Sequence, residues 1–295
     1  MADDLVIRTE ALGKEYGRFM RRRRVVALTG LTLEVRRGEI FGLLGPNGSG
    51  KTTTLKLLLG LCRPSHGRAV VMDREAGDTA VKARIGFLPE ESAFYPFLNA
   101  TETLDFYARL FGMPRARRRR EIDRVLSLVG LGAERRRPLR EYSKGMARRV
   151  GVAQALINDP ELLLMDEPTS GLDPIGAAEI RDVLLELKER GKTIVACSHL
   201  LGDVQAVCDR IAVLHRGRLV LCGEAAALLR ARESWSIRVD AEGVPAPDEL
   251  RVALEARGVQ VEAVEHPSRT LEDLFREAVR RGAEEPAPGP GPGGR

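Results

Sequence analysis

Short apolar runs alternate with helix-like segments over roughly the first 215 residues of this chain. Several runs have apolar residues at successive positions, which is typical of parallel strands covered on both faces. The pattern predicts strands at residues 6–9, 31–35, 40–44, 69–72, 85–88, 162–165, 193–197 and 211–214. Helical patterns lie between them, most clearly at 51–59 and 175–190. This alternation predicts an α/β core built in layers.

The pattern changes between residues 101 and 157. Three helical patterns follow one another there without a convincing strand, and Gly130, Gly132 and Pro138 interrupt them. We therefore expect a helical subdomain, at about 91–160, inserted into an α/β domain that covers residues 1–225.

The last 70 residues show a third pattern, in which predicted helices and strands alternate. They predict a helix at 224–231, a strand at 234–240, a helix at 248–257, a strand at 259–264 and a helix at 271–280. This order indicates a small α+β accessory domain at 226–282. Residues 283–295 consist mostly of Glu, Pro, Ala and Gly, so we expect a disordered tail.

Composition excludes several classes of protein. The hydrophobic share of 43% is too high for a chain that is disordered throughout, and no apolar run approaches the roughly 18 residues that cross a bilayer. The N-terminus has no cationic segment followed by an apolar core, so we expect a cytoplasmic protein without a secretory signal. The cysteines form no CxxC pair, which argues against a zinc site or a disulfide framework and predicts packing residues. They are Cys62, Cys197, Cys208 and Cys222.

Arginine clusters stand out against the modest net charge of +5. They lie at 21–24, 115–120 and 135–137. Such runs form solvated faces or bind an anionic lipid surface or a nucleic acid, and the sequence leaves these alternatives open. For the run at 18–24 we expect a solvated hairpin tip, with a phosphate or lipid contact as the alternative.

A phosphate-binding loop follows the predicted strand at 40–44. Its sequence is Gly45-Pro46-Asn47-Gly48-Ser49-Gly50-Lys51-Thr52. The pattern GxxxxGK[ST] between a strand and a helix predicts binding of a nucleoside triphosphate, because backbone amides and the helix N-terminus bind phosphate oxygens. Lys51 is expected at the β- and γ-phosphates, Thr52 at Mg²⁺, and Thr53 as a donor to the α-phosphate.

Two acids end the predicted strand at 162–165. Side chains alternate along a strand, so Asp166 and Glu167 can do different work. Asp166 is expected to hold Mg²⁺ through water, and Glu167 to act at the γ-phosphate as general base or as the group that orients water. His199 follows the strand at 193–197, where an imidazole can bind a phosphate oxygen or the attacking water.

The segment Tyr142-Ser143-Lys144-Gly145-Met146 indicates a family. It lies about twenty residues before the Asp-Glu pair and resembles the signature of ABC (ATP-binding cassette) ATPases, in the form seen in many bacterial exporters. Ser143 can cap the following helix and Gly145 exposes backbone amides, which together form a second anion-binding surface. The resemblance covers about residues 4–222 and implies the P-loop NTPase fold of an ABC ATPase core.

The resemblance implies further roles. Tyr16 resembles the aromatic residue that stacks on adenine, residues 170–173 with Asp173 resemble the D-loop, and His199 resembles the switch histidine. It also implies ATP and Mg²⁺ as cofactors, and a head-to-tail homodimer in which the signature residues 143–146 contact the ATP held by the other subunit.

Two positions depart from the family pattern. Glu90 stands where the Q-loop has Gln; a carboxylate can still coordinate Mg²⁺ and serve the reaction, yet it adds negative charge near the γ-phosphate. Lys144 and Met146 replace Gly and Gln in the signature. Lys144 either attracts the nucleotide of the partner or faces solvent, and the sequence does not decide between these.

The expected function is an ATPase that dimerises around ATP and drives transport through a separate membrane permease. Residues 267–275 resemble the tail of ABC-2 type drug exporters, which favours export, and apolar residues at 94–98 are expected to contact the permease. The protein would then lie on the inner face of the membrane.

The alternative is a soluble ABC ATPase that acts on nucleic acid or the ribosome. The single cassette, without zinc motif or coiled-coil insertion, argues against it, so no specific nucleic acid is expected. A non-hydrolysing regulatory binder is disfavoured because Glu167 and His199 are both present.

Overall fold

The computed structural model describes residues 4–18, 21–199, 202, 206–229, 247–259 and 261. The chain divides into two compact units, Met1–Leu229 and Arg230–Arg295. In the second unit, α9 (Pro247–Glu255) confirms the helix predicted at 248–257. The strand predicted at 234–240, most of that at 259–264, the helix at 271–280 and the tail at 283–295 lie outside the described residues.

A six-stranded sheet forms the centre of the first unit, in the order β10-β9-β3-β8-β7-β6. Its strands are β3 (Ile40–Leu44), β6 (Ile85–Leu88), β7 (Leu162–Asp166), β8 (Thr193–Ser198), β9 (Arg210–His215) and β10 (Arg218–Glu224). All neighbours pair in parallel except β10, which is antiparallel to β9. Every residue of β3, β7 and β8 is buried, so the apolar runs are strands covered on both faces, as predicted.

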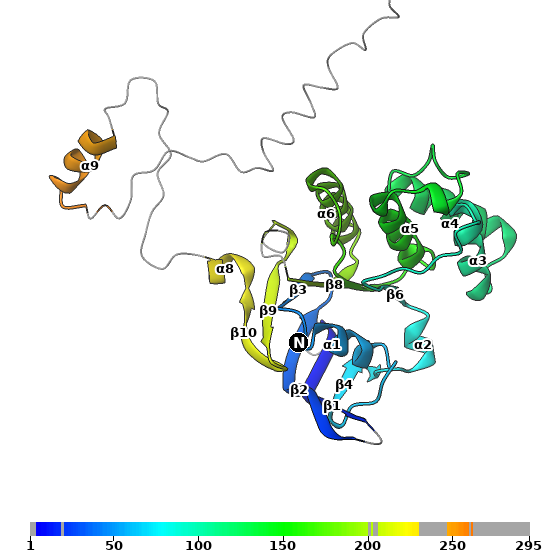
Figure 1. The fold of residues 1–295 in the computed structure, drawn as a ribbon, viewed down its shortest axis with the longest axis horizontal. Helices are drawn as coiled ribbons and strands as arrows, with labels where there is room; N and C mark the ends of the chain where they lie inside the picture. Colours follow the sequence, from blue (N-terminus) through cyan, green and yellow to red (C-terminus); the bar gives the residue numbers. More distant parts are fainter. Residues whose placement is uncertain are drawn as a thin grey trace, which may run out of the picture. The chain divides into compact units, whose positions relative to one another are not determined.

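The two faces of this sheet carry different layers (Figure 1). Helix α1 (Lys51–Leu58) and a second, four-stranded sheet lie on one side, while α3 to α6 lie on the other. Side chains of β3 alternate between the layers: Phe41 and Leu43 pack with the first core, and Ile40 packs with the second. The predicted α/β layered core is confirmed.

The second sheet is antiparallel, in the order β2-β1-β4-β5. Its strands are β1 (Leu5–Arg18), β2 (Arg21–Arg36), β4 (His66–Val71) and β5 (Arg74–Glu75). Both β1 and β2 are much longer than the strands predicted at 6–9 and 31–35. Arg18 of β1 pairs with Arg21 of β2, so the two strands form a hairpin in the basic run, as expected.

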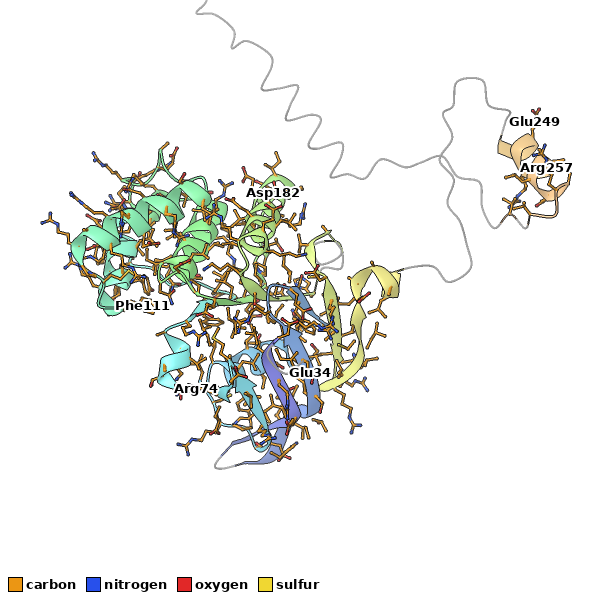
Figure 2. All side chains as sticks on the ribbon, turned by 180° about the vertical axis from the view of Figure 1, so that it is seen from behind. Glu34, Arg74, Phe111, Asp182, Glu249 and Arg257 are labelled. Carbon is orange, nitrogen blue, oxygen red and sulfur yellow. The ribbon has the colours of Figure 1, made fainter. Side chains whose placement is uncertain are left out.

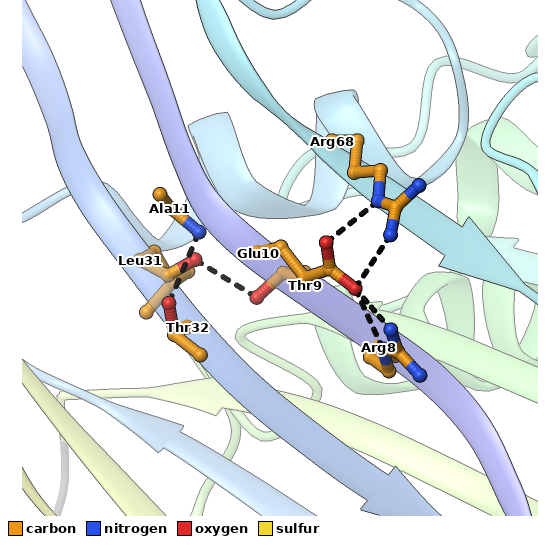
Figure 3. Close-up of polar contacts among 7 residues, drawn as sticks. All are labelled: Arg8, Thr9, Glu10, Ala11, Leu31, Thr32 and Arg68. Carbon is orange, nitrogen blue, oxygen red and sulfur yellow. Dashed lines mark hydrogen bonds and ion pairs between the residues drawn. The ribbon is translucent and has the colours of Figure 1, made fainter.

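A bulge interrupts β1 after Thr9, where Ala11 has a positive φ of 43°. Thr32 supplies a hydrogen-bond acceptor at the bulge: its hydroxyl accepts a hydrogen bond from the amide of Ala11 at 3.0 Å (Figure 3). The buried hydroxyl of Thr9 donates to the Leu31 carbonyl at 3.0 Å. Side-chain hydroxyls therefore replace the backbone partners that a bulge removes.

Three helices build the helical subdomain, as predicted. They are α3 (Ala100–Leu110), α4 (Arg115–Leu128) and α5 (Lys144–Leu156), with a short 3₁₀ turn at Leu139–Glu141 before α5. Asn99 and Glu102 form a capping box at the start of α3. Ser143 caps α5 by accepting a hydrogen bond from the Met146 amide at 3.2 Å, so its predicted role as a cap is confirmed.

Other helices with described bounds are α2 (Thr79–Lys82), α6 (Pro174–Glu189) and α8 (Ala225–Leu229). Helix α6 confirms the prediction at 175–190. Helix α8 begins one residue after the start predicted at 224 because Glu224 ends β10, and residues 230–231 lie outside the described residues. Cys222 is exposed on β10, the edge strand, so the expectation that all four cysteines are packing residues is wrong at that position.

Candidate nucleotide-binding site

The loop between β3 and α1 needs glycine for steric reasons. At Gly45 the backbone has φ 151°, and a Cβ atom would lie 2.2 Å from the Leu214 carbonyl oxygen. At Gly50 the φ is 110°, and a Cβ would lie 2.7 Å from the carbonyl oxygen of Ala27. Both positions allow a close backbone approach and a conformation that residues with a side chain rarely adopt. The glycine pattern therefore has the structural role that the motif predicts.

Lys51 lies at the centre of this loop and is only 6% exposed. Its Nζ donates to the Gly45 carbonyl at 2.6 Å and lies 3.4 Å from Oε1 of Glu167. Helix α1 begins at Lys51 without a side-chain hydrogen bond at its N-cap, Gly50. The amides of its first turn thus point beside a buried cation, an arrangement that suits phosphate oxygens.

Asp166 and Thr52 meet next to Lys51. The Asp166 carboxylate is 2% exposed and accepts a hydrogen bond from the Thr52 hydroxyl. Burial raises the pKa of Asp166, and the bond from Thr52 partly opposes that rise. Its Oδ1 has no hydrogen-bond partner among the described residues. An unpartnered buried carboxylate oxygen beside a hydroxyl is a donor set that fits Mg²⁺.

Glu167 lies between a cation and an imidazole. Its Oε2 is 2.8 Å from Nδ1 of His199, while Oε1 faces Lys51. A carboxylate oxygen accepts hydrogen bonds, so Nδ1 is the donor of this pair. The His199 side chain is 41% exposed, which leaves it accessible to a ligand. Lys51, Thr52, Asp166, Glu167 and His199 thus form one connected site.

Tyr16 lies next to this site. Its phenol oxygen accepts a hydrogen bond from Thr53 on α1, and its ring is 40% exposed. Nζ of Lys14 lies 5.2 Å from the ring centroid. The structure therefore places an accessible aromatic face beside the phosphate helix, where a base could stack. Of the other loop residues, Pro46, Asn47 and Gly48 are exposed, and Ser49 has a buried hydroxyl without a hydrogen-bond partner among the described residues.

The other predicted site residues lie apart from the phosphate loop. Among the described residues, no hydrogen bond or ion pair joins that loop to Glu90, to the signature residues Ser143, Lys144, Gly145 and Met146, or to Asp173. Glu90 is exposed, and its contact is through its carbonyl, which accepts from Arg148 at 2.8 Å. Asp173 caps α6 by accepting from the Gly176 amide at 2.7 Å. Lys144 is exposed. The roles of these residues at the nucleotide stay predictions.

Arg148 contacts this site and was not predicted. It is 7% exposed and donates to the main-chain carbonyls of Asp166 and Glu167. The sequence does contain a signal: Arg148 shares a helix face with Gly151, Val152 and Ala155, all buried, so a charge stands where the helical period predicts an apolar residue.

The model of the ABC transporter family matches residues 28–170. The chain is 48% identical to the uncharacterized ABC transporter ATP-binding protein sll0415 of Synechocystis, over 79% of this chain and 66% of the relative. It is 36% identical to YhcH of Bacillus subtilis, also an uncharacterized ABC transporter ATP-binding protein, over 86% of this chain and 92% of the relative. The fluoroquinolones export ATP-binding protein MT2762 of Mycobacterium tuberculosis is 42% identical over 74% of this chain and 71% of its own length.

Solved structures agree with these relatives. The cassette cbiO1 of Clostridium perfringens, part of the ABC transporter complex cbiONQ, has a TM-score of 0.69 and 27% identity over 86% of this chain and 98% of its own. The dimeric cassette MJ0796 in a post-hydrolysis state with ADP and Pi has a TM-score of 0.68 and 26% identity, covering 74% and 98% of the two chains. The predicted ABC ATPase fold and activity class are confirmed. This chain belongs to the family of ABC transporter ATP-binding proteins.

Proposed function

We propose that this chain is the ATP-binding and hydrolysing subunit of an exporter, working as a homodimer on a separate membrane permease. The observation that carries the proposal is the convergence of Lys51, Thr52, Asp166, Glu167 and His199 beside an uncapped helix N-terminus. This set contains a cation for phosphate, oxygen ligands for a metal and a buried carboxylate for water.

Each residue of the site has a separate role in the proposed hydrolysis. Lys51 and the amides of α1 bind and orient the phosphates, and Tyr16 stacks on the adenine. Thr52 and Asp166 would hold Mg²⁺, which when bound neutralises charge on the β- and γ-phosphates. Glu167 orients the attacking water and accepts its proton, while His199 holds the carboxylate in place through its Nδ1 at 2.8 Å.

The signature helix acts on the ATP of a second copy. The tip of α5 carries Ser143 and Gly145, and no described contact links it to the phosphate loop of its own chain. A second chain arranged head-to-tail brings that tip, with Asp173, to the opposite nucleotide. The similar cassette MJ0796 is a dimer, which supports this arrangement. Lys144 is exposed next to Ser143 and would add a positive charge there.

A permease is the proposed membrane partner. In the part of the chain that the structure describes, no helix has the length and apolar character to cross a bilayer. Exposed aromatic side chains gather before and along α3, and Phe111 ends this group at the edge of the subdomain (Figure 2). They are Tyr95, Phe97, Phe106 and Phe111. Such a patch suits an apolar protein surface, and it would hold the chain at the inner face of the membrane.

Three arginines of the clusters pair within the chain, and the single cassette without a coiled-coil insertion argues against a nucleic-acid role. Arg118 pairs with Asp105 at 2.6 Å, Arg135 with Asp123 at 2.6 Å, and Arg137 with Glu141 at 3.3 Å. These guanidinium groups form ion pairs with carboxylates of the same subdomain. We therefore propose no specific nucleic-acid partner.

Purification from membranes in a mild detergent tests the proposal. We expect the tagged chain to bring down an integral membrane protein, in a complex whose ATP hydrolysis stops when Glu167 is replaced by Gln. Recovery of the chain with ribosomes or nucleic acid, and without a membrane protein, would contradict the transporter assignment.

A further inference from the structure

Arg148 contacts two segments that are far apart in the sequence and adjoin the carboxylate pair. Its Nη1 donates to the carbonyls of Pro89 at 2.7 Å and Glu90 at 2.8 Å, just after β6. Its Nη2 donates to the carbonyls of Asp166 and Glu167, each at 2.6 Å, and its Nε to that of Pro168 at 3.1 Å.

These five bonds use the full donor capacity of the side chain. A guanidinium group has five N–H donors in a fixed planar fork, and each of them here reaches a main-chain carbonyl. The side chain is almost fully buried, and burial lowers its pKa to about 10, so it stays charged at neutral pH. A buried charge is costly unless its hydrogen bonds are complete, and here they are complete.

The backbone that Arg148 holds is strained. Glu167 has a positive φ of 52°, a strained conformation that a residue with a side chain adopts only where its surroundings impose it. Three of the five bonds go to residues 166–168, on both sides of the strained position. The fork of Arg148 is thus placed to impose the turn that aims Glu167 at Lys51 and His199.

The helix that carries Arg148 packs tightly on the strand beside it. A Cβ at Gly86 in β6 would lie 2.0 Å from the Ala155 carbonyl oxygen of α5, and a Cβ at Gly151 would lie 2.8 Å from Leu88. Helix α5 and the end of β6 therefore form one closely packed body. The chain enters the helical subdomain just after Glu90, and α5 is the last helix of that subdomain.

We infer that Arg148 is a positioning residue that couples the helical subdomain to the catalytic carboxylate. It holds Glu167 in its productive conformation only while α5 and residues 89–90 keep their places, so hydrolysis depends on the position of the subdomain. This inference rests on the proposed ATPase function and names no new contact with the nucleotide.

The test compares kcat, KM and ATP affinity of the full chain carrying Arg148→Lys or Arg148→Gln. Lysine keeps the charge and loses the fork, and glutamine keeps two N–H donors without the charge. Arg124→Lys is the matched control, because Arg124 donates to the Leu156 carbonyl at the other end of α5 and lies outside the site. We expect at least a tenfold loss of kcat for both Arg148 variants, with the Kd for ATP within threefold of wild type and Arg124→Lys unchanged.

A kcat within twofold of wild type for either folded Arg148 variant would overturn the inference. If neither variant folds, hydrogen exchange on the unmodified chain decides: amides of residues 165–170 should exchange in step with those of α5, and earlier exchange of 165–170 overturns the coupling. Glu167→Gln is measured alongside. If the unmodified chain hydrolyses no ATP, the proposed function fails. If Glu167→Gln hydrolyses ATP as fast as wild type, the proposed role of Glu167 fails, and the inference fails with it. If Glu167→Gln is inactive while Arg148→Lys is normal, only the inference fails.

Discussion

The pKa of a carboxylate is shifted down in the helical subdomain, at Asp105, and up in the phosphate site, at Asp166. In the subdomain, burial opposes ionisation of Asp105, but hydrogen bonds from Arg118 and Arg109 outweigh it, and the pKa falls below its usual value. In the site, burial raises the pKa of Asp166, and the hydrogen bond from Thr52 does not cancel the rise. Oδ1 of Asp166 and Oε1 of Glu167 have no hydrogen-bond partner among the described residues, although Lys51 faces the latter.

This difference indicates that the charged groups of the subdomain stabilise the fold, whereas the acids of the site serve to bind a ligand. The ion pairs of the subdomain are complete within the chain, whereas the acids of the site are buried without full compensation. A folded protein retains buried, incompletely paired acids mainly where function requires them. Substitutions in the site should therefore change chemistry and binding, and substitutions among the subdomain pairs should change only stability.

Glu167→Gln should have the largest effect. Loss of a preorganised catalytic group lowers kcat on the order of 10² to 10³, while glutamine has nearly the same shape and should leave ATP binding intact. Steady-state ATPase assays and direct ATP binding measure the two quantities. Asp182→Asn is the matched control, because it makes the same acid-to-amide change on the exposed side of α6 (Figure 2). Normal turnover by Glu167→Gln would show that another group activates the water.

Lys51→Ala should come next. It removes the cation expected at the phosphates and leaves Glu167, 3.4 Å away, without its ion-pair partner. We expect the Kd for ATP to rise at least tenfold, which corresponds to about 1.4 kcal/mol. Lys56→Ala on the same helix is exposed and should bind ATP normally. Equal affinities of the two variants, measured by equilibrium binding, would count against the phosphate role of Lys51.

Ser143→Ala tests the tip of α5. The cap bond to the Met146 amide should be worth about 1 kcal/mol of stability, and loss of the anion contact should lower hydrolysis about tenfold while a single chain still binds ATP. Asn99→Ala removes the cap of α3 in the same subdomain and should cost similar stability without the loss of hydrolysis. A Ser143→Ala variant that is less stable yet fully active would show that Ser143 acts only as a helix cap.

The phosphate site was largely predictable because its signals are local. Lys51 and Thr52 come after the loop that follows the buried strand β3, and Asp166 and Glu167 lie at the end of the buried strand β7. Arg148 was missed because its role depends on carbonyls 18–20 and 58–59 residues away. In the sequence it is one of many arginines, and only its place on a buried helix face sets it apart.

The strands inside the central sheet were predicted, and so was β6 at one edge, but β10 at the other edge was not. Strands β3, β7 and β8 are buried on both faces, so their residues are apolar without interruption. Strand β10 lies at the sheet edge, and its apolar run at residues 219–222 is mostly exposed, so it does not have the buried character of the central strands. The outer half of β1 was missed for a similar reason, because a bulge after Thr9 breaks the alternation on which a strand prediction depends.

Asp105→Asn should have the smallest effect, confined to stability and dependent on pH. Because the pKa of Asp105 is lowered in the folded chain, its stabilising contribution is present above the unfolded value near 3.8 and is lost as pH falls through the lower folded value. The pairs are partly exposed, so the wild type should exceed the variant in free energy of unfolding by less than about 1 kcal/mol at pH 6. That difference should shrink toward pH 3, as measured by urea titration at each pH, while ATP affinity at pH 7 stays unchanged. A stability difference that does not depend on pH would mean that the carboxylate acts by packing and not by charge, and the contrast between subdomain and site would lose its electrostatic basis.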